Sequence, residues 1–306
     1  MARPQPGLLA EANLQSLYLL FKAVPGTEAL IRHHLACFHP MINDYCDEYS
    51  ESELSAFVAI GSEYWRTLFG QHAPKRLKPF PEMAKDTRVA PHTPYDVFIH
   101  IRSDRVDVNH LVGSHVCELF ADSLKLVEQV KGFRYLDGRD LTGFVDGTEN
   151  PHGAKRRQVA LVDKADDSDF AAGSYVHIQR YRHQMERWNE TPTIQQEDII
   201  GRTKSDNQEY PSEKKSAFAH IKRTNLKDAA GNSIEILRQS MPYGTMKVQG
   251  LFFISICHSP EPFELMLSSM INGDEHGVYD KLLDYTRPET GAAFFAPSLE
   301  FLRKNI

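Results

Sequence analysis

The sequence predicts an α+β fold made of two similar halves, each an antiparallel sheet with helices packed on one face. Strand-length apolar segments are each followed by a turn and an amphipathic helix, and this unit occurs twice in each half of the chain. The length of 306 residues fits about two domains of ~150 residues. We therefore expect duplicated ferredoxin-like domains, with boundaries at residues 1–138 and 139–306.

Each unit combines an apolar strand with a helix whose apolar residues are spaced by three and four positions. In chain order the predicted strands are residues 16–24, 95–103, 174–181 and 251–258. The helices that follow are predicted over about 27–37, through Val112, Val116, Leu119 and Phe120, in a shorter stretch after 181, and through Phe263, Met266, Leu267 and Met270. Further strands are expected at 55–60, 233–238 and 292–296, the last closing the second sheet. The polar segment 187–211 carries two prolines and is predicted to run over the surface or to wrap a ligand.

Composition excludes several classes of function. The net charge is −6 with acids and bases interspersed, which argues against a nucleic-acid-binding protein. No two of the four cysteines form a Cys-x-x-Cys pair, so neither a zinc knuckle nor a covalently attached c-type haem is supported. The first ten residues have no apolar core of signal length, and Lys22 interrupts the first apolar run. We therefore expect a cytoplasmic protein without a membrane partner.

The most informative segment is 143–151, which reads Gly-Phe-Val-Asp-Gly-Thr-Glu-Asn-Pro. It places Asp146 between Gly143 and Gly147, and both glycines allow the backbone to take positive φ and to approach a ligand closely. An acid in such a turn either stabilises the turn itself or points into a cavity as a catalytic group. The segment lies close to the predicted join between the halves, and ligands favour domain interfaces.

Two further residues stand out in the second half. His220 lies in the run Ala-His-Ile-Lys-Arg. Arg238 follows 18 positions later, near the end of a strand pattern and before a segment, 239–244, that is predicted to turn. Taken alone, Arg238 is a surface cation or a salt-bridge partner, and His220 is one of fourteen histidines.

These residues belong to a series of motifs in a fixed order. The series comprises Gly-x-x-Asp-Gly at 143–147, Ile-Gly-Arg-Thr-Lys at 200–204, Ala-His-Ile-Lys-Arg at 219–223, Met-Pro-Tyr-Gly at 241–244 and the run 290–298. The series resembles the dye-decolorizing (DyP-type) haem peroxidases. The resemblance covers most of the chain and is strongest from 141 to 298. It implies paired ferredoxin-like domains that bind haem b, with the haem pocket mainly in the C-terminal half.

The resemblance implies a catalytic group on the distal side of the haem, where peroxide would bind. Asp146 would remove a proton from hydrogen peroxide and return it to the departing oxygen. Arg238 would face the haem and stabilise the negative charge that develops as the O–O bond breaks. Ser240 would be a distal polar neighbour. The family's chemistry passes through a ferryl intermediate that electron donors then reduce. A carboxylate stays ionised at lower pH than an imidazole, so mildly acidic conditions are expected to suit the reaction.

The resemblance also implies the groups that hold the haem. His220 would be the axial ligand of the iron, and its other ring N–H would be donated to an acceptor that raises its basicity. Asp280 resembles that acceptor, with Asp284 as the rival. Arg202 would pair with a haem propionate, because a guanidinium fork matches a carboxylate.

Three classes of function remain open from the sequence. The first is a haem peroxidase that uses hydrogen peroxide and oxidises broad, dye-like organic donors. The second is a haem-handling protein that releases or stores iron, with incidental peroxidase activity. The third is a duplicated module without haem. The distal acid and arginine favour the first, because haem binding alone requires no base. The resemblance further implies assembly into a homo-oligomer.

Overall fold

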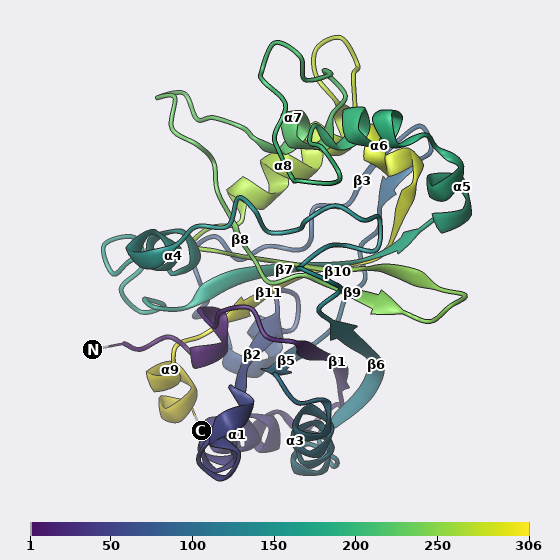
Figure 1. Ribbon diagram of the computed structural model, residues 1–306. Helices are drawn as coiled ribbons and strands as arrows, with labels where there is room; N and C mark the ends of the chain where they lie inside the picture. The colour runs from purple at the N-terminus through teal and green to yellow at the C-terminus, as the bar shows by residue number, and fades with distance from the viewer. Residues whose placement is uncertain (1, 306) are drawn as a thin grey trace.

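The computed structural model describes residues 2–305 as an α+β protein whose two halves each contribute a sheet (Figure 1). The first half runs β1 (Gln15–Ala23), α1 (Glu28–Glu48), β2 (Ser55–Gly61), α2 (Trp65–Phe69), β3 (Met83–Lys85), β4 (Arg88–Ala90), β5 (Val97–Ser103), α3 (Val106–Leu119) and β6 (Leu124–Phe133). The second runs α4 (Gly153–Ala160), β7 (Ser174–His183), α5 (Met185–Glu190), α6 (Thr193–Ile200), α7 (His220–Thr224), β8 (Leu237–Arg238), β9 (Met241–Gly244), β10 (Gln249–Cys257), α8 (Glu261–Asn272), β11 (Thr286–Ala296) and α9 (Leu299–Lys304).

Both halves have the same strand order. In the first half the spatial order is β2-β5-β1-β6, and in the second it is β11-β7-β10 followed by β9 and β8. Numbered along each half, both orders are those of a ferredoxin-like β-α-β-β-α-β unit, with antiparallel neighbours. The predicted duplication and fold class are therefore confirmed.

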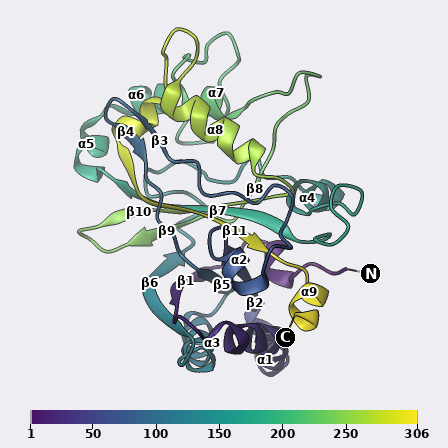
Figure 2. The same cartoon turned by 180° about the vertical axis from the view of Figure 1, so that it is seen from behind.

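Hydrogen bonds at two edges join the sheets into one nine-stranded arrangement. At one edge β11 pairs with β2 through Phe294 and Phe295, and at the other β6 pairs with β9 through Gly132. The sheets face one another, and their outer faces carry the helices, with α1 and α3 on one side and α7 and α8 on the other (Figures 1 and 2). The protein is thus layered as helices, sheet, sheet and helices.

The strands that read as apolar runs are buried on both faces. In β1, Leu17 and Leu19 pack into the core beneath α1 and α3, whereas Tyr18 and Leu20 pack into the layer between the sheets. Successive side chains of a strand point to opposite faces, so a strand covered on both sides is apolar throughout rather than alternating. This arrangement accounts for the run at 17–21 that dominates the N-terminal sequence.

Several elements differ from the expected ones. Helix α1 continues through Pro40 to Glu48 instead of ending near Cys37, because Phe38 and Ile42 remain buried on the core-facing side of the helix and outweigh the missing proline N–H. The expected strand 233–238 is reduced to Leu237–Arg238. The expected turn at 239–244 contains strand β9, which pairs with β10.

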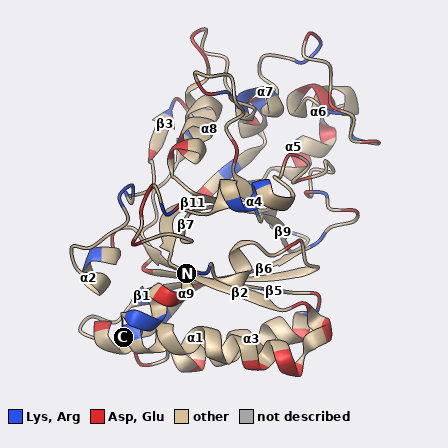
Figure 3. Ribbon diagram, turned by 90° about the vertical axis from the view of Figure 1, so that its left-hand side faces the viewer, with Lys and Arg blue, Asp and Glu red and all other residues tan. Residues whose placement is uncertain are grey.

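Segment 187–211 contains most of α5 and all of α6 and continues without a helix from Gly201 to Pro211. Acidic and basic residues are interspersed over both halves (Figure 3). Within residues 2–305, no helix is both long and apolar enough to span a bilayer.

Candidate active site

A cavity of about 300 Å³ lies in the second half and brings together most of the residues that the sequence singled out. Its wall is formed by the 140–149 turn, strands β7 and β10, and helices α7 and α8. Most of the lining is apolar, with side chains such as Phe144, Ile236, Phe253 and Leu267. A few polar groups converge on it, which is the usual character of a small-molecule site.

The turn at 143–151 has the backbone that its glycines predict. Gly143 and Gly147 take φ of +92° and +76°, a region that strains other residues. A Cβ at position 143 would also collide with the side chain of Lys204. The turn directs Asp146 toward the cavity, and the Gly147 N–H donates to Asp146 Oδ1 over 2.7 Å.

Asp146 contacts Arg238, which lies 92 positions later in the sequence. The Arg238 guanidinium donates from Nη1 to Asp146 Oδ1 over 3.3 Å, and both residues line the cavity. Oδ1 therefore has two partners, whereas Oδ2 accepts no hydrogen bond from the described residues. The second carboxylate oxygen remains available to a substrate.

Asn150 fixes the backbone of Arg238, and sequence reasoning did not assign it a role. Its Nδ2 donates to the Arg238 carbonyl over 2.8 Å, and its Oδ1 accepts the Arg238 N–H over 2.9 Å. Both backbone groups of one residue are thus satisfied by one side chain of the Asp146 turn. The sequence feature that could have indicated this role is the position of Asn150 at the end of the Gly-rich turn, before Pro151.

On the helical side of the cavity, His220 is the first residue of α7. Its Nδ1 lies 2.6 Å from Oδ2 of Asp280, whose side chain is fully buried. The other carboxylate oxygen of Asp280 accepts the Leu282 N–H over 3.0 Å. The rival Asp284 instead contacts the Tyr279 hydroxyl and the Lys281 ammonium. The geometry therefore pairs His220 with Asp280 and leaves Nε2 of the imidazole for the cavity.

Arg202 lines the same cavity and is nearly buried. Its guanidinium donates to Glu149 over 3.0 Å and to Glu209 over 3.3 Å, and it also binds the carbonyl of Asn207. Arg202 therefore holds the end of the Asp146 turn through Glu149.

Two predicted site residues, Ser240 and Asp280, do not line the cavity, and of these Asp280 contacts it through His220 whereas Ser240 faces elsewhere. The Ser240 Oγ accepts the Ile254 N–H of β10 over 3.1 Å. Strand β8 ends at Arg238, so Ser240 does not continue the strand alternation that would place it on the face of Arg238.

A buried Asp140–His183 pair at the cavity wall was not anticipated. His183 Nε2 lies 3.1 Å from Asp140 Oδ1, and its Nδ1 bonds Thr286. Burial raises the pKa of Asp140, but the His183 charge and the hydrogen bonds from His183 and Thr142 outweigh this effect and hold the pKa below 3.8. This pair fixes the start of the segment that carries Asp146.

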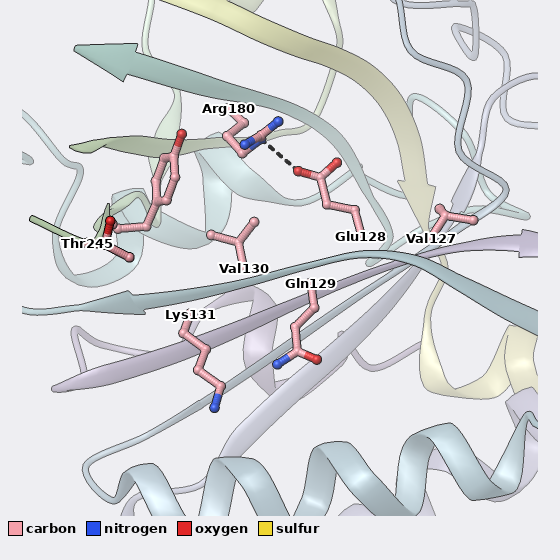
Figure 4. A pocket seen from close by; sticks show the side chains of 9 residues that line it. Val127, Glu128, Gln129, Val130, Lys131, Arg180 and Thr245 are labelled. Atoms are coloured by element: carbon pink, nitrogen blue, oxygen red, sulfur yellow. Dashed lines mark ion pairs between the residues drawn. The ribbon is translucent and has the colours of Figure 1, made fainter. Parts of the chain in front are cut away.

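A second hollow, of about 560 Å³, is an open groove at the seam between β6 and β9 (Figure 4). Arg180 lies over it, paired with Glu128 over 2.7 Å. None of the predicted site residues lies there, so the groove is not the site that the motifs indicate.

The comparisons identify the family. Residues 10–134 match the Dyp-type peroxidase N-terminal domain, and residues 137–301 match the Dyp-type peroxidase C-terminal domain. This chain belongs to the Dyp-type peroxidases. A dye-decolorizing peroxidase from Mycolicibacterium paratuberculosis is 37% identical over 303 residues, covering 98% of this chain and 85% of the relative.

Solved Dyp-type peroxidases share the whole fold. The crystal structure of a Dyp-type peroxidase protein from Shewanella oneidensis is 52% identical, with a TM-score of 0.97 over 99% of both chains. A DypB variant from Rhodococcus jostii RHA1, solved in complex with heme, is 34% identical, with a TM-score of 0.93 over 98% of both chains. A deferrochelatase from Escherichia coli is a more distant relative, 25% identical over 79% of this chain and 65% of its own length.

Proposed function

We propose that this Dyp-type peroxidase binds haem b, reduces hydrogen peroxide and oxidises organic, dye-like electron donors. The observation that carries the proposal is one cavity lined by His220, whose Nδ1 is held by the buried Asp280 behind it, and by the Asp146–Arg238 pair. The first pair suits an iron ligand, and the second suits a peroxide.

The residues present fit a haem group. The largely apolar lining suits a porphyrin, and Asp280 fixes Nδ1 of His220 so that Nε2 is the available ligand atom. Among residues 2–305, no group of three or more His, Cys, Asp or Glu side chains could hold a metal ion. One imidazole as the only protein ligand is typical of haem iron. Arg202, at the cavity wall, is the candidate partner for a propionate.

Haem, when bound, supplies one-electron redox chemistry. The chain supplies the groups that act on the peroxide. Asp146 Oδ2 is free to take a proton from one peroxide oxygen and to deliver it to the other. The permanent charge of Arg238, at 3.3 Å from Asp146, would stabilise the negative charge that develops on the departing oxygen.

A haem-handling function is the alternative, and the distant deferrochelatase relative is consistent with it. His220 and Asp280 would serve either function. The Asp146–Arg238 pair favours the peroxidase, because holding haem does not require a proton acceptor beside a fixed cation.

We further propose that residues 139–306 form the haem-binding domain and residues 1–138 the other domain. All residues that line the cavity lie between Asp140 and Thr286, which supports this division.

The test is reconstitution of the purified protein with haem, followed by assays of peroxide-dependent dye oxidation. His220→Ala should lose most of the bound haem, measured from the Soret band. His276→Ala is the matched control, because that side chain is 79% exposed. Full haem occupancy and an unchanged ferric spectrum in His220→Ala would contradict the ligand assignment. Haem binding without peroxide-dependent turnover would favour the alternative.

A further inference from the structure

Arg102 of β5 is a buried arginine with unused donors, and it lies away from the cavity. It is 3% exposed, and its Nε and Nη1 have no hydrogen-bond partner among residues 2–305. No carboxylate of the described chain forms an ion pair with it. Guanidinium keeps its charge in proteins and can only donate hydrogen bonds, so a buried and unpaired guanidinium is costly.

Further unpaired polar atoms surround Arg102 in the layer between the sheets. Strand register places Ser16 of β1 on one side of Arg102 and Ser55 of β2 on the other. His100 lies two residues earlier on the same face, and its ring stacks on Tyr18 at 4.7 Å. The hydroxyls of Tyr18 and Ser55 and Nδ1 of His100 are buried without a partner among the described residues. Each of these three atoms can donate a hydrogen bond.

The layer also has excess positive charge. Burial lowers the pKa of Arg102 to about 10. The nearby charge of Arg156 acts in the same direction, and the charges of Glu11 and Asp104 act against it. Arg156 donates to the carbonyls of Leu9 and Ala10. Its acidic partner is Glu11 at 3.4 Å, whose side chain is 81% exposed. Asp104 is also exposed, so the compensating carboxylates lie in solvent, whereas the two guanidinium groups are buried.

We propose that Arg102 is the centre of a buried binding site for a small monovalent anion of the halide class. A halide accepts hydrogen bonds and brings the missing negative charge. Water would satisfy the donors, but each molecule would add two donors of its own and would leave the charge uncompensated. The donor-rich surroundings of Arg102 therefore suit an anion better.

The site lies behind the segment that carries Arg238. Gln239 and Arg156 both donate to the carbonyl of Ala10. Arg156, whose charge acts on Arg102, therefore lies next to Gln239, the residue that follows Arg238. Arg102 does not line the 300 Å³ cavity, so the anion site is separate from the haem site.

The first experiment locates the anion. Crystals of the haem-loaded protein, grown without chloride and soaked in sodium bromide, are measured at the bromine absorption edge. We expect an internal anomalous peak at hydrogen-bond distance from the Arg102 guanidinium. Peaks at the surface alone, with water-like density beside Arg102, would mean an adventitious ion only and would overturn the proposal.

The second experiment measures linkage in solution. Bromide replaces gluconate at constant ionic strength while the melting temperature and the Soret band are recorded. Above the dissociation constant, each tenfold increase in bromide should raise the parent's melting temperature by on the order of 2–4 °C. The dependence should disappear in Arg102→Met and persist in Arg66→Met, the control at an exposed arginine of α2.

Ser55→Ala is a second test variant. If Arg102→Met does not fold, Ser55→Ala removes one donor without removing the charge, and it should weaken the bromide dependence. A melting temperature that is independent of bromide in the parent would overturn the proposal. So would a dependence that follows a change in the Soret band, because that result would place the anion at the haem.

Discussion

Asn150→Ala tests whether the Asp146 turn positions Arg238. Strand β8 is only two residues long, so the β-ladder gives Arg238 little support. Asn150 makes two hydrogen bonds to the Arg238 backbone, at 2.8 and 2.9 Å, and alanine removes both.

The structure sets the expected magnitude. A neutral hydrogen bond contributes about 1 kcal/mol net, so the free energy of unfolding should fall by about 2 kcal/mol. The same bonds hold the residue whose guanidinium lies 3.3 Å from Asp146. If their full energy maintains that orientation, its loss corresponds to about a 30-fold lower rate with peroxide.

The assay is stopped-flow mixing of haem-loaded protein with excess hydrogen peroxide, followed at the Soret band, with denaturant unfolding measured in parallel. Asn189→Ala, at an exposed position of α5, is the control and should match the parent in both. The double variant Asn150→Ala, Arg238→Leu should react no more slowly than Arg238→Leu alone, because coupled residues are not additive. A parent-like rate in a destabilised Asn150→Ala protein would refute the positioning argument.

Three other predictions concern the same cavity. Asp280→Asn replaces the charge-assisted hydrogen bond to His220 with a neutral one. The ferric/ferrous potential of bound haem should therefore rise by on the order of 50 mV in a redox titration, and the control Asp284→Asn should leave it unchanged. Arg238→Leu should slow the peroxide reaction at least as much as Asp146→Asn, with losses on the order of 10²–10³ for an oriented charge and 10²–10⁴ for a general base; a parent-like rate in Arg238→Leu would reverse this ranking. The pKa of Asp140 is held below its ordinary value of 3.8 in the folded protein. The stability that this carboxylate contributes is therefore complete above pH 3.8 and is lost as the pH falls through the pKa of the folded state. Asp140→Asn should flatten the loss of stability below pH 3.8, and curves of stability against pH that run parallel in the parent and the variant would contradict this.

The strands that the sequence predicts are those covered on both faces. Residues 17–21 are all apolar, and residues 251–257 are apolar except for Ser255, because a helix-covered core lies on one side and the inter-sheet layer on the other. The sequence indicates no strand over β6, in which more exposed residues alternate with less exposed ones. Strand β9 contains Pro242 and Gly244, which are turn residues by local preference. Its pairing with β10 is a tertiary effect that local preference cannot report.

Some site residues could likewise be predicted from local sequence motifs, whereas others depend on contacts between residues far apart in the sequence. The Gly-rich turn and His220 carry local motifs, and the structure brings Asp146, Arg238 and His220 to one cavity. The contacts of Asn150 span 88 residues, and those of Asp140 with His183 span 43, so neither follows from local pattern. The resemblance implied that Ser240 is a distal neighbour of Arg238, but strand β8 ends at Arg238 and the Ser240 hydroxyl instead accepts the Ile254 N–H.

One short turn connects most of these functional groups. Asp146 contacts Arg238, Glu149 contacts Arg202, and Asn150 holds the Arg238 backbone. The proposed proton acceptor, the cation beside it and the propionate partner are therefore positioned by five consecutive residues. Such an arrangement requires a turn with one fixed shape, since any displacement would move all three contacts together. The positive φ of the glycines on either side of Asp146 is the feature that specifies this shape, and it explains why the motif consists of a carboxylate enclosed by glycines.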